Sequence, residues 1–81
     1  MIFLPVQSRM ARAALGWGVR ELAGAAKVAI DTVVRFERGE ELKERTVEAI
    51  QRALEAGGIE LIDENGGGPG VRLRNRHQKK S

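Results

Sequence analysis

The chain has 81 residues, of which 42% are hydrophobic and 31% are charged. This length allows one hydrophobic core, because a chain of this size buries only about 60% of the surface that it exposes when unfolded. Cysteine is absent and His77 is the single histidine, which excludes a disulfide framework, a cysteine nucleophile and a zinc site. We expect one cytoplasmic domain without a membrane span, since the longest uncharged run, residues 1–8, cannot cross a bilayer.

Charge is segregated along the chain. Residues 1–38 carry six basic and three acidic side chains, residues 39–71 carry three and eight, and residues 72–81 carry five and none. This distribution of charge favours a partner whose phosphate groups contact the basic ends of the chain, while the acidic middle faces away from that partner. The alternative for the basic tail, residues 75–81, is a disordered and solvated end.

Apolar residues recur at helical spacing through the first 58 residues and predict four helices. The residues predicted to cap or end these helices are Gly16, Gly18, Gly39, Thr46 and Gly57. The predicted apolar faces are Val6, Met10, Ala14 and Trp17 in the first helix, Leu22, Ala23 and Ala26 in the second, Ile30, Val33 and Phe36 in the third, and Val47, Ile50, Ala53 and Leu54 in the fourth.

After Gly58 the apolar period changes from about 3.6 to 2, which predicts two short strands. A glycine-rich loop, residues 63–70, joins them. This loop lacks the Gly-Lys-Ser/Thr ending of a phosphate cradle and opens no helix, so a hairpin turn is the favoured interpretation. The sequence therefore predicts a mainly α fold, with four compact helices and a C-terminal β-hairpin.

The sequence offers no catalytic constellation. It has no cysteine, one histidine in the tail, and serines only at positions 8 and 81. We therefore do not expect an enzyme. Trp17 follows a helix-ending glycine at an apolar position, which favours burial in the core over stacking on a nucleic-acid base.

Residues 15–39 combine a short helix, a tight turn and a second short helix, which is the spacing of a helix-turn-helix. Three segments, RAALGWGVRELA (12–23), FERGE (36–40) and ALEAGGIELIDENGGGPGVRLR (53–74), resemble small bacterial regulators of the Xre/Cro helix-turn-helix family. The resemblance implies a lambda-repressor-like DNA-binding domain over residues 1–58 and a dimer on a near-palindromic operator, without a cofactor. The chain has Lys27 where such proteins usually have a glycine, and Ala29 where they usually have a capping Ser or Thr.

The third helix is expected to supply the base contacts, since Val33 and Phe36 on one side would leave the other side free. Arg35 has the planar fork that binds guanine O6 and N7, and Thr32 can bond a base or a phosphate. The expected base-contact residues are Ala29, Ile30, Asp31, Thr32 and Arg35. The alternative for Arg35 is a solvated helix charge, and Asp31 is repelled by phosphates unless it meets a cytosine.

Phosphate contacts are expected from the free N–H groups at the start of the second helix and from the loop after the third. The expected phosphate-contact residues are Gly18, Val19, Arg20, Arg38, Lys43 and Arg45. The alternative for each cation is an exposed side chain with no partner. The resemblance also implies a structural ion pair between Arg12 and Glu37, the alternative being two separate surface charges.

The hairpin is expected to hold a homodimer. A two-stranded hairpin is marginal in water, and its open edge readily recruits a second chain. The expected interface is residues 59–74, with strands paired across the two-fold axis through Ile59, Leu61, Val71 and Leu73, and with Arg72 and Arg74 on the exposed side. The alternative is dimerisation through the fourth helix alone.

The expected function is that of a sequence-specific transcriptional regulator, a dimeric repressor that binds a palindromic operator through the major groove of double-stranded DNA. The alternative is a protein-interaction module, antiactivator- or antitoxin-like, that keeps the helix-turn-helix scaffold. In that case Ile30 and Val34 would serve as exposed apolar anchors.

Overall fold

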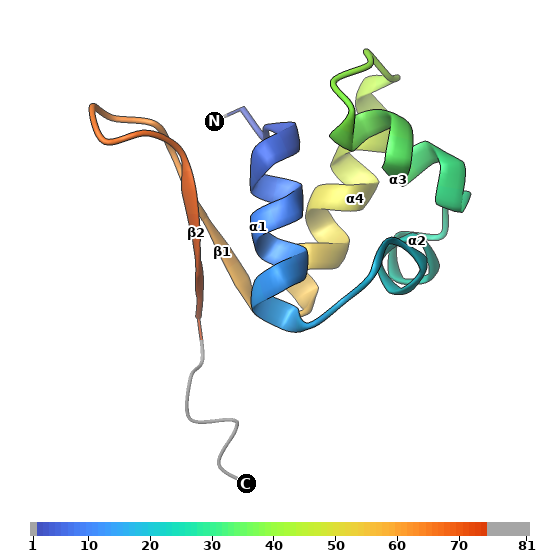
Figure 1. The fold of residues 1–81 in the computed structure, drawn as a ribbon, viewed down its shortest axis with the longest axis horizontal. Coiled ribbons are helices and arrows are strands. Elements are labelled where there is room, and N and C mark those ends of the chain that lie inside the picture. The colour runs from blue at the N-terminus through green and yellow to red at the C-terminus, as the bar shows by residue number, and fades with distance from the viewer. Residues whose placement is uncertain (1, 75–81) are drawn as a thin grey trace, which may run out of the picture.

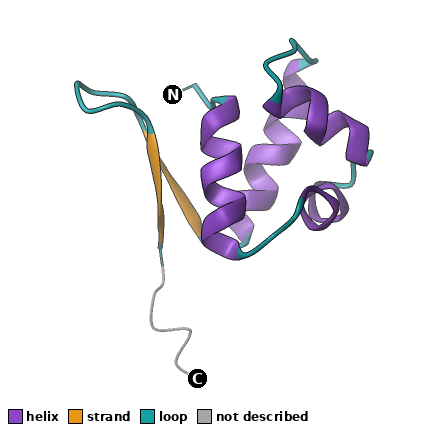
Figure 2. Ribbon diagram, viewed as in Figure 1, coloured by secondary structure: helices purple, strands orange, loops and turns teal. Residues whose placement is uncertain are grey.

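The computed structural model describes residues 2–74, which form four helices and one antiparallel pair of strands. The elements are α1 (Pro5–Leu15), α2 (Val19–Ala26), α3 (Ile30–Glu37), α4 (Glu44–Ala56), β1 (Ile59–Ile62) and β2 (Gly70–Leu73). The strands lie along α1 on the side away from α2 and α3 (Figure 1), and the secondary structure is mostly helical (Figure 2). The predicted fold class is thus confirmed at this level, whereas the predicted basic tail and His77 lie outside the described residues.

Glycines end three of the helices as predicted, and Gly57 is the cap residue after α4. Gly16 after α1 and Gly39 after α3 have φ angles of 71° and 98°, which only glycine adopts without strain. The predicted start of the fourth helix is wrong: α4 begins at Glu44, and Thr46 lies inside its first turn. The carboxylate of Glu44 interacts favourably with the positive end of the helix dipole, so the helix extends upstream of the expected cap.

The core lies between the four helices and β1. Its fully buried apolar side chains are Ala11, Leu22, Val33, Ile50, Leu54 and Ile59. The predicted apolar faces of α2 and α4 are therefore confirmed. Trp17 packs at the edge of this core, where its ring lies so close to Gly57 that a Cβ atom there would be 3.0 Å from a ring carbon.

The predicted apolar face of the first helix is wrong. Val6 and Ala14 are exposed, and the buried residues of α1 are Gln7, Ser8 and Ala11. Two polar side chains therefore occupy core positions, which is possible because each has hydrogen-bond partners inside the protein. No helix within residues 2–74 is long and apolar enough to cross a bilayer.

Gln7 joins α1 to both strands of the hairpin. Its Nε2 donates to the carbonyl oxygens of Ile62 and Gly70, at 2.9 and 3.0 Å, and its Oε1 accepts from the N–H of Leu4 at 2.9 Å. The amide is fully buried, so these bonds form where water does not compete with them. One side chain thereby fixes the loop end of the hairpin against the helical part of the domain.

The register of the strands places four of their five apolar residues on one face, and Ile62 lies on the other. Ile59 is opposite Leu73 and Leu61 is opposite Val71, and directly opposed residues share a face of the sheet. On the other face, Arg72 forms an ion pair with Glu60 at 3.1 Å. The apolar face contacts α1 and α4, and the hairpin therefore belongs to the same core as the helices.

Replacing Gln7 tests this joint. Gln7→Met keeps the length of the side chain but removes both donors, and we expect the free energy of unfolding to fall by about 2 kcal/mol because two carbonyls lose a buried partner. Gln7→Glu should cost more, since a carboxylate would then face those carbonyls. Urea unfolding followed by Trp17 fluorescence measures both changes.

Gln51→Met is the matched control, because among residues 2–74 the amide of Gln51 bonds only Glu55, at 3.2 Å, on the partly exposed side of α4. Its cost should stay below about 0.5 kcal/mol. Equal urea midpoints for Gln7→Met and the unmutated protein would contradict the role of Gln7.

Candidate functional site

A left-handed turn at Lys27 sets the direction of α3 relative to α2. Lys27 has a φ of 61° and a ψ of 44°, and among residues 2–74 it is the one residue other than glycine with a positive φ. The N–H of Val28 then donates to the carbonyl of Ala23 at 3.0 Å and closes the end of α2. The turn thus keeps the left-handed conformation that favours glycine, although the residue is a lysine. This backbone strain lowers the free energy of unfolding by about 1 kcal/mol.

The outer side of α3 borders an open groove. Val33, Phe36 and Glu37 hold the inner side of the helix in the domain. The groove runs between α3 and the start of α4, and it is lined by Val28, Ala29, Thr32, Arg35, Glu41, Leu42, Lys43 and Thr46. Three of the five expected base-contact residues and one expected phosphate-contact residue therefore lie around the same hollow.

The other two expected base-contact residues lie outside the groove. Asp31 is exposed on α3 between the groove side and a second stripe formed by Ile30 and Val34. Ile30 is 40% exposed and Val34 is 37% exposed, so the predicted burial of Ile30 with Val33 and Phe36 is wrong. Ile30 is the first residue of α3, and the buried residues of this helix, Val33, Phe36 and Glu37, all lie closer to its C-terminal end.

Glu40 engages two arginines at the end of α3. Its Oε1 accepts from Arg35 Nε at 2.9 Å, and its Oε2 accepts from Arg38 Nε and Nη2 at 3.0 and 2.8 Å. These hydrogen bonds lower the pKa of Glu40 and raise that of Arg35. The sequence analysis missed Glu40, although the left-handed Gly39 directly before it signals that the chain turns back toward α3.

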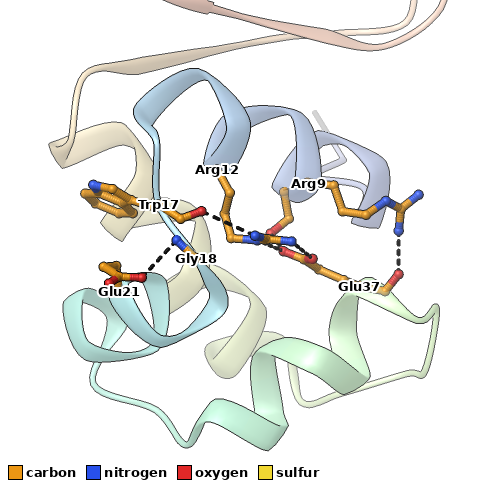
Figure 3. Close-up of polar contacts among 7 residues, drawn as sticks. Arg9, Arg12, Trp17, Gly18, Glu21 and Glu37 are labelled. Atoms are coloured by element: carbon orange, nitrogen blue, oxygen red, sulfur yellow. Dashed lines mark hydrogen bonds and ion pairs between the residues drawn. The ribbon is translucent and has the colours of Figure 1, made fainter.

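The N-terminus of α2 already has an acceptor of its own. The carboxylate of Glu21 accepts from the N–H of Gly18 at 2.9 Å (Figure 3). Gly18 was expected to face a phosphate, but this donor is occupied and the added negative charge opposes an anion there. Arg20 is exposed on the first turn of α2, and Arg45 is exposed on the first turn of α4.

A buried carboxylate fixes the end of α3 to α1. Arg12 forms a two-point ion pair with Glu37, with Nη2 to Oε1 at 2.7 Å and Nε to Oε2 at 2.9 Å, and Ser8 Oγ donates to Oε2 at 2.6 Å. Arg9 donates to the backbone carbonyl of Glu37, and Arg12 also reaches the carbonyl of Trp17 at 3.3 Å (Figure 3). The structure thus brings the expected ion pair together and adds two residues to it.

Burial and hydrogen bonding act in opposite directions on Glu37. Burial by itself would raise its pKa, but the hydrogen bonds from Arg12 and Ser8 and the positive charges of Arg12 and Arg9 outweigh this and lower it below the ordinary value of 4.5. The carboxylate therefore stays ionised near neutral pH, where it keeps α1 and α3 together.

Within residues 2–74 no cluster of three or more His, Asp or Glu side chains is arranged to hold a metal ion. No protein-family model matches the chain, and no curated protein matches its sequence significantly. The groove beside α3, where the partly exposed Arg35 and the exposed Lys43 lie, is therefore the candidate functional site.

Removing the arginine of the buried pair should be costly. In Arg12→Ala we expect the free energy of unfolding to fall by about 3 kcal/mol, because Glu37, whose side chain is only 7% exposed, loses its cation. Arg52→Ala is the control, since Arg52 pairs with Glu48 at 3.6 Å on the exposed side of α4 and should contribute less than about 0.5 kcal/mol. A thermal midpoint unchanged in Arg12→Ala would defeat this expectation.

The same cluster should govern stability in acid. Because the pKa of Glu37 is lowered in the folded protein, its contribution is complete above the unfolded value near 4.5 and is lost as pH falls through the folded value. Urea unfolding between pH 7 and pH 3 should therefore show a smaller acid loss in Glu37→Gln than in the unmutated protein, on top of a lower stability at pH 7.

Proposed function

We propose that the chain is a helix-turn-helix transcriptional regulator that inserts α3 into the major groove of operator DNA. The observation that carries this proposal is the groove in which Thr32, Arg35 and Lys43 meet on the outer side of a helix whose inner side is fixed in the core. A recognition helix needs this combination of a rigid inner face and an accessible outer one.

The side chains around the groove suit DNA chemically. Arg35 retains the Nη donors of its guanidinium for guanine, and the hydroxyl of Thr32 can bond a base edge or a phosphate. Lys43 stands across the groove, at the N-terminus of α4, where a phosphate of the adjacent backbone would pass. Arg20 on α2 would contact the backbone on the other side, as the first helix of such motifs crosses it.

Substitution of these two kinds of residue should have different effects on binding. Arg35→Ala should cost about 1–3 kcal/mol on the preferred site and relax the choice of base at one position. Lys43→Ala should weaken binding to all sequences alike and reduce the dependence of log K on log salt by about one. Fluorescence anisotropy with a site selected from a random DNA pool, at several salt concentrations, measures both. The proposal fails if the unmutated protein binds no DNA at low salt.

A protein partner is the second candidate, because Ile30 and Val34 lie one turn apart on the exposed side of α3. Such a pair can anchor an apolar surface. Binding through this stripe would be almost indifferent to salt, whereas binding through phosphates weakens steeply between low and moderate salt.

The proposed regulator is a homodimer formed through β2. The N–H of Arg74 bonds the carbonyl of Gly58, so the alternation of an antiparallel ladder directs the backbone groups of Val71 and Leu73 to the outer edge. That edge can pair with the same edge of a second copy about a two-fold axis. Helix α4 suits this role less, because its buried side already packs in the core and its outer side carries Arg45, Glu48 and Arg52.

A charge at this edge should separate the dimer. Leu73 is 39% exposed, and we expect Leu73→Glu to be monomeric in light scattering at concentrations where the unmutated chain is dimeric, since two like charges would meet near the axis. Ile2→Glu is the control, because Ile2 is 74% exposed and lies outside the hairpin. A dimeric Leu73→Glu variant, or a monomeric unmutated chain, would contradict pairing through β2.

A further inference from the structure

We infer that Glu40 determines the specificity of the proposed DNA binding by fixing Arg35 for one guanine and by reducing its attraction to phosphates of any sequence. This inference rests on the proposed function and names one residue that acts through another. Glu40 is a positioning residue, because it holds Arg35 at 2.9 Å and need not touch DNA itself.

The backbone brings Glu40 to Arg35 independently of its side chain. The N–H of Gly39 donates to the carbonyl of Phe36 at 3.0 Å, and the N–H of Glu40 donates to the carbonyl of Arg35 at 3.1 Å. These two bonds form a Schellman motif, which reverses the chain after α3. The side chain of Glu40 can therefore be changed without removing the bonds that end the helix.

The hydrogen bond from Nε leaves the Nη donors of Arg35 available for a base. A guanidinium has five donors, and Arg35 uses Nε for Glu40. Within the described residues its Nη atoms form no hydrogen bond or ion pair, so both Nη groups can bond O6 and N7 of a guanine. Arg38 differs, because Glu40 occupies both its Nε and its Nη2.

The pairing also changes what Arg35 can attract. One carboxylate shared by two arginines leaves a single net positive charge at the end of α3, and Asp31 contributes a further attraction to Arg35. An unpaired arginine would swing toward any phosphate, which adds affinity without sequence information. An arginine that is fixed and partly neutralised instead gains most binding free energy where its planar guanidinium bonds a matching base.

Glu41 provides a matched control. It is the next residue, carries the same charge and lines the groove, but no ion pair with an arginine is recorded for it among residues 2–74. Both Glu40→Ala and Glu41→Ala remove one negative charge, whereas only Glu40→Ala removes the hydrogen bond that fixes Arg35.

The experiment measures anisotropy of Glu40→Ala, Glu41→Ala and the unmutated protein on three DNAs. These are the site selected from a random pool by the unmutated protein, the same site with the guanine that depends on Arg35 replaced, and an unrelated duplex. We expect both variants to bind the unrelated duplex about fivefold more tightly, because each removes one negative charge near phosphates. Glu40→Ala should in addition lose at least about fivefold in discrimination against the replaced guanine, and Glu41→Ala should lose none.

Equal discrimination in Glu40→Ala and Glu41→Ala would overturn the inference, because Glu40 would then act only as a charge. Thermal unfolding keeps this outcome interpretable, since the contacts of Glu40 are exposed and its loss should leave the midpoint nearly unchanged. If the unmutated protein selects no sequence from the pool, the proposed function itself fails and the inference falls with it. That result would be seen with the unmutated protein itself, so failure of the proposed function can be distinguished from failure of the inference about Glu40.

Discussion

The position of α3 depends on one buried carboxylate. Glu37 is the last residue of the helix, and its side chain is held by Arg12 and Ser8 while its backbone carbonyl is held by Arg9. All three partners lie on α1, so a single helix fixes the end of α3 through charge and hydrogen bonds rather than through apolar packing alone. Such a cluster tolerates little displacement, because a carboxylate that leaves its partners inside a protein loses far more than it does in water.

The second constraint lies on the same turn of α1. Gln7 precedes Ser8 and points to the hairpin, while Ser8 and Arg12 point to α3. The first helix therefore lies between the hairpin and α3 and binds both of them through polar side chains. Its exposed apolar residues and buried polar residues invert the usual arrangement, and the satisfied hydrogen bonds make this inversion stable.

This inversion explains what the sequence could and could not predict. The buried faces of α2 and α4, the glycine at the end of α3 and the apolar row of the two strands follow from spacing, because apolar burial and left-handed caps leave local signals. The inner face of α1 does not, since Gln7 and Ser8 are buried only through partners far away along the chain. Ile30 fails for the opposite reason: its apolar character fits the helical period, but it is the first residue of α3 and lies outside the buried part of that helix. Glu40 was missed because a single acidic residue acquires its role only from the turn that returns it to Arg35.

The balance of charges around α3 bears on the oligomeric state required by the proposed function. Arg35, Arg38 and Lys43 are opposed by Asp31, Glu40 and Glu41, so one domain offers little net positive charge to a duplex there. Because nonspecific affinity comes mainly from neutralised phosphates, a single copy would depend on the few matched contacts that α3 makes. Two copies joined through β2 would add the contacts of two half-sites while paying the entropy of association only once. Weak attraction to random DNA therefore limits binding where the bases do not match. The proposed dimer restores affinity at sites where both half-sites match.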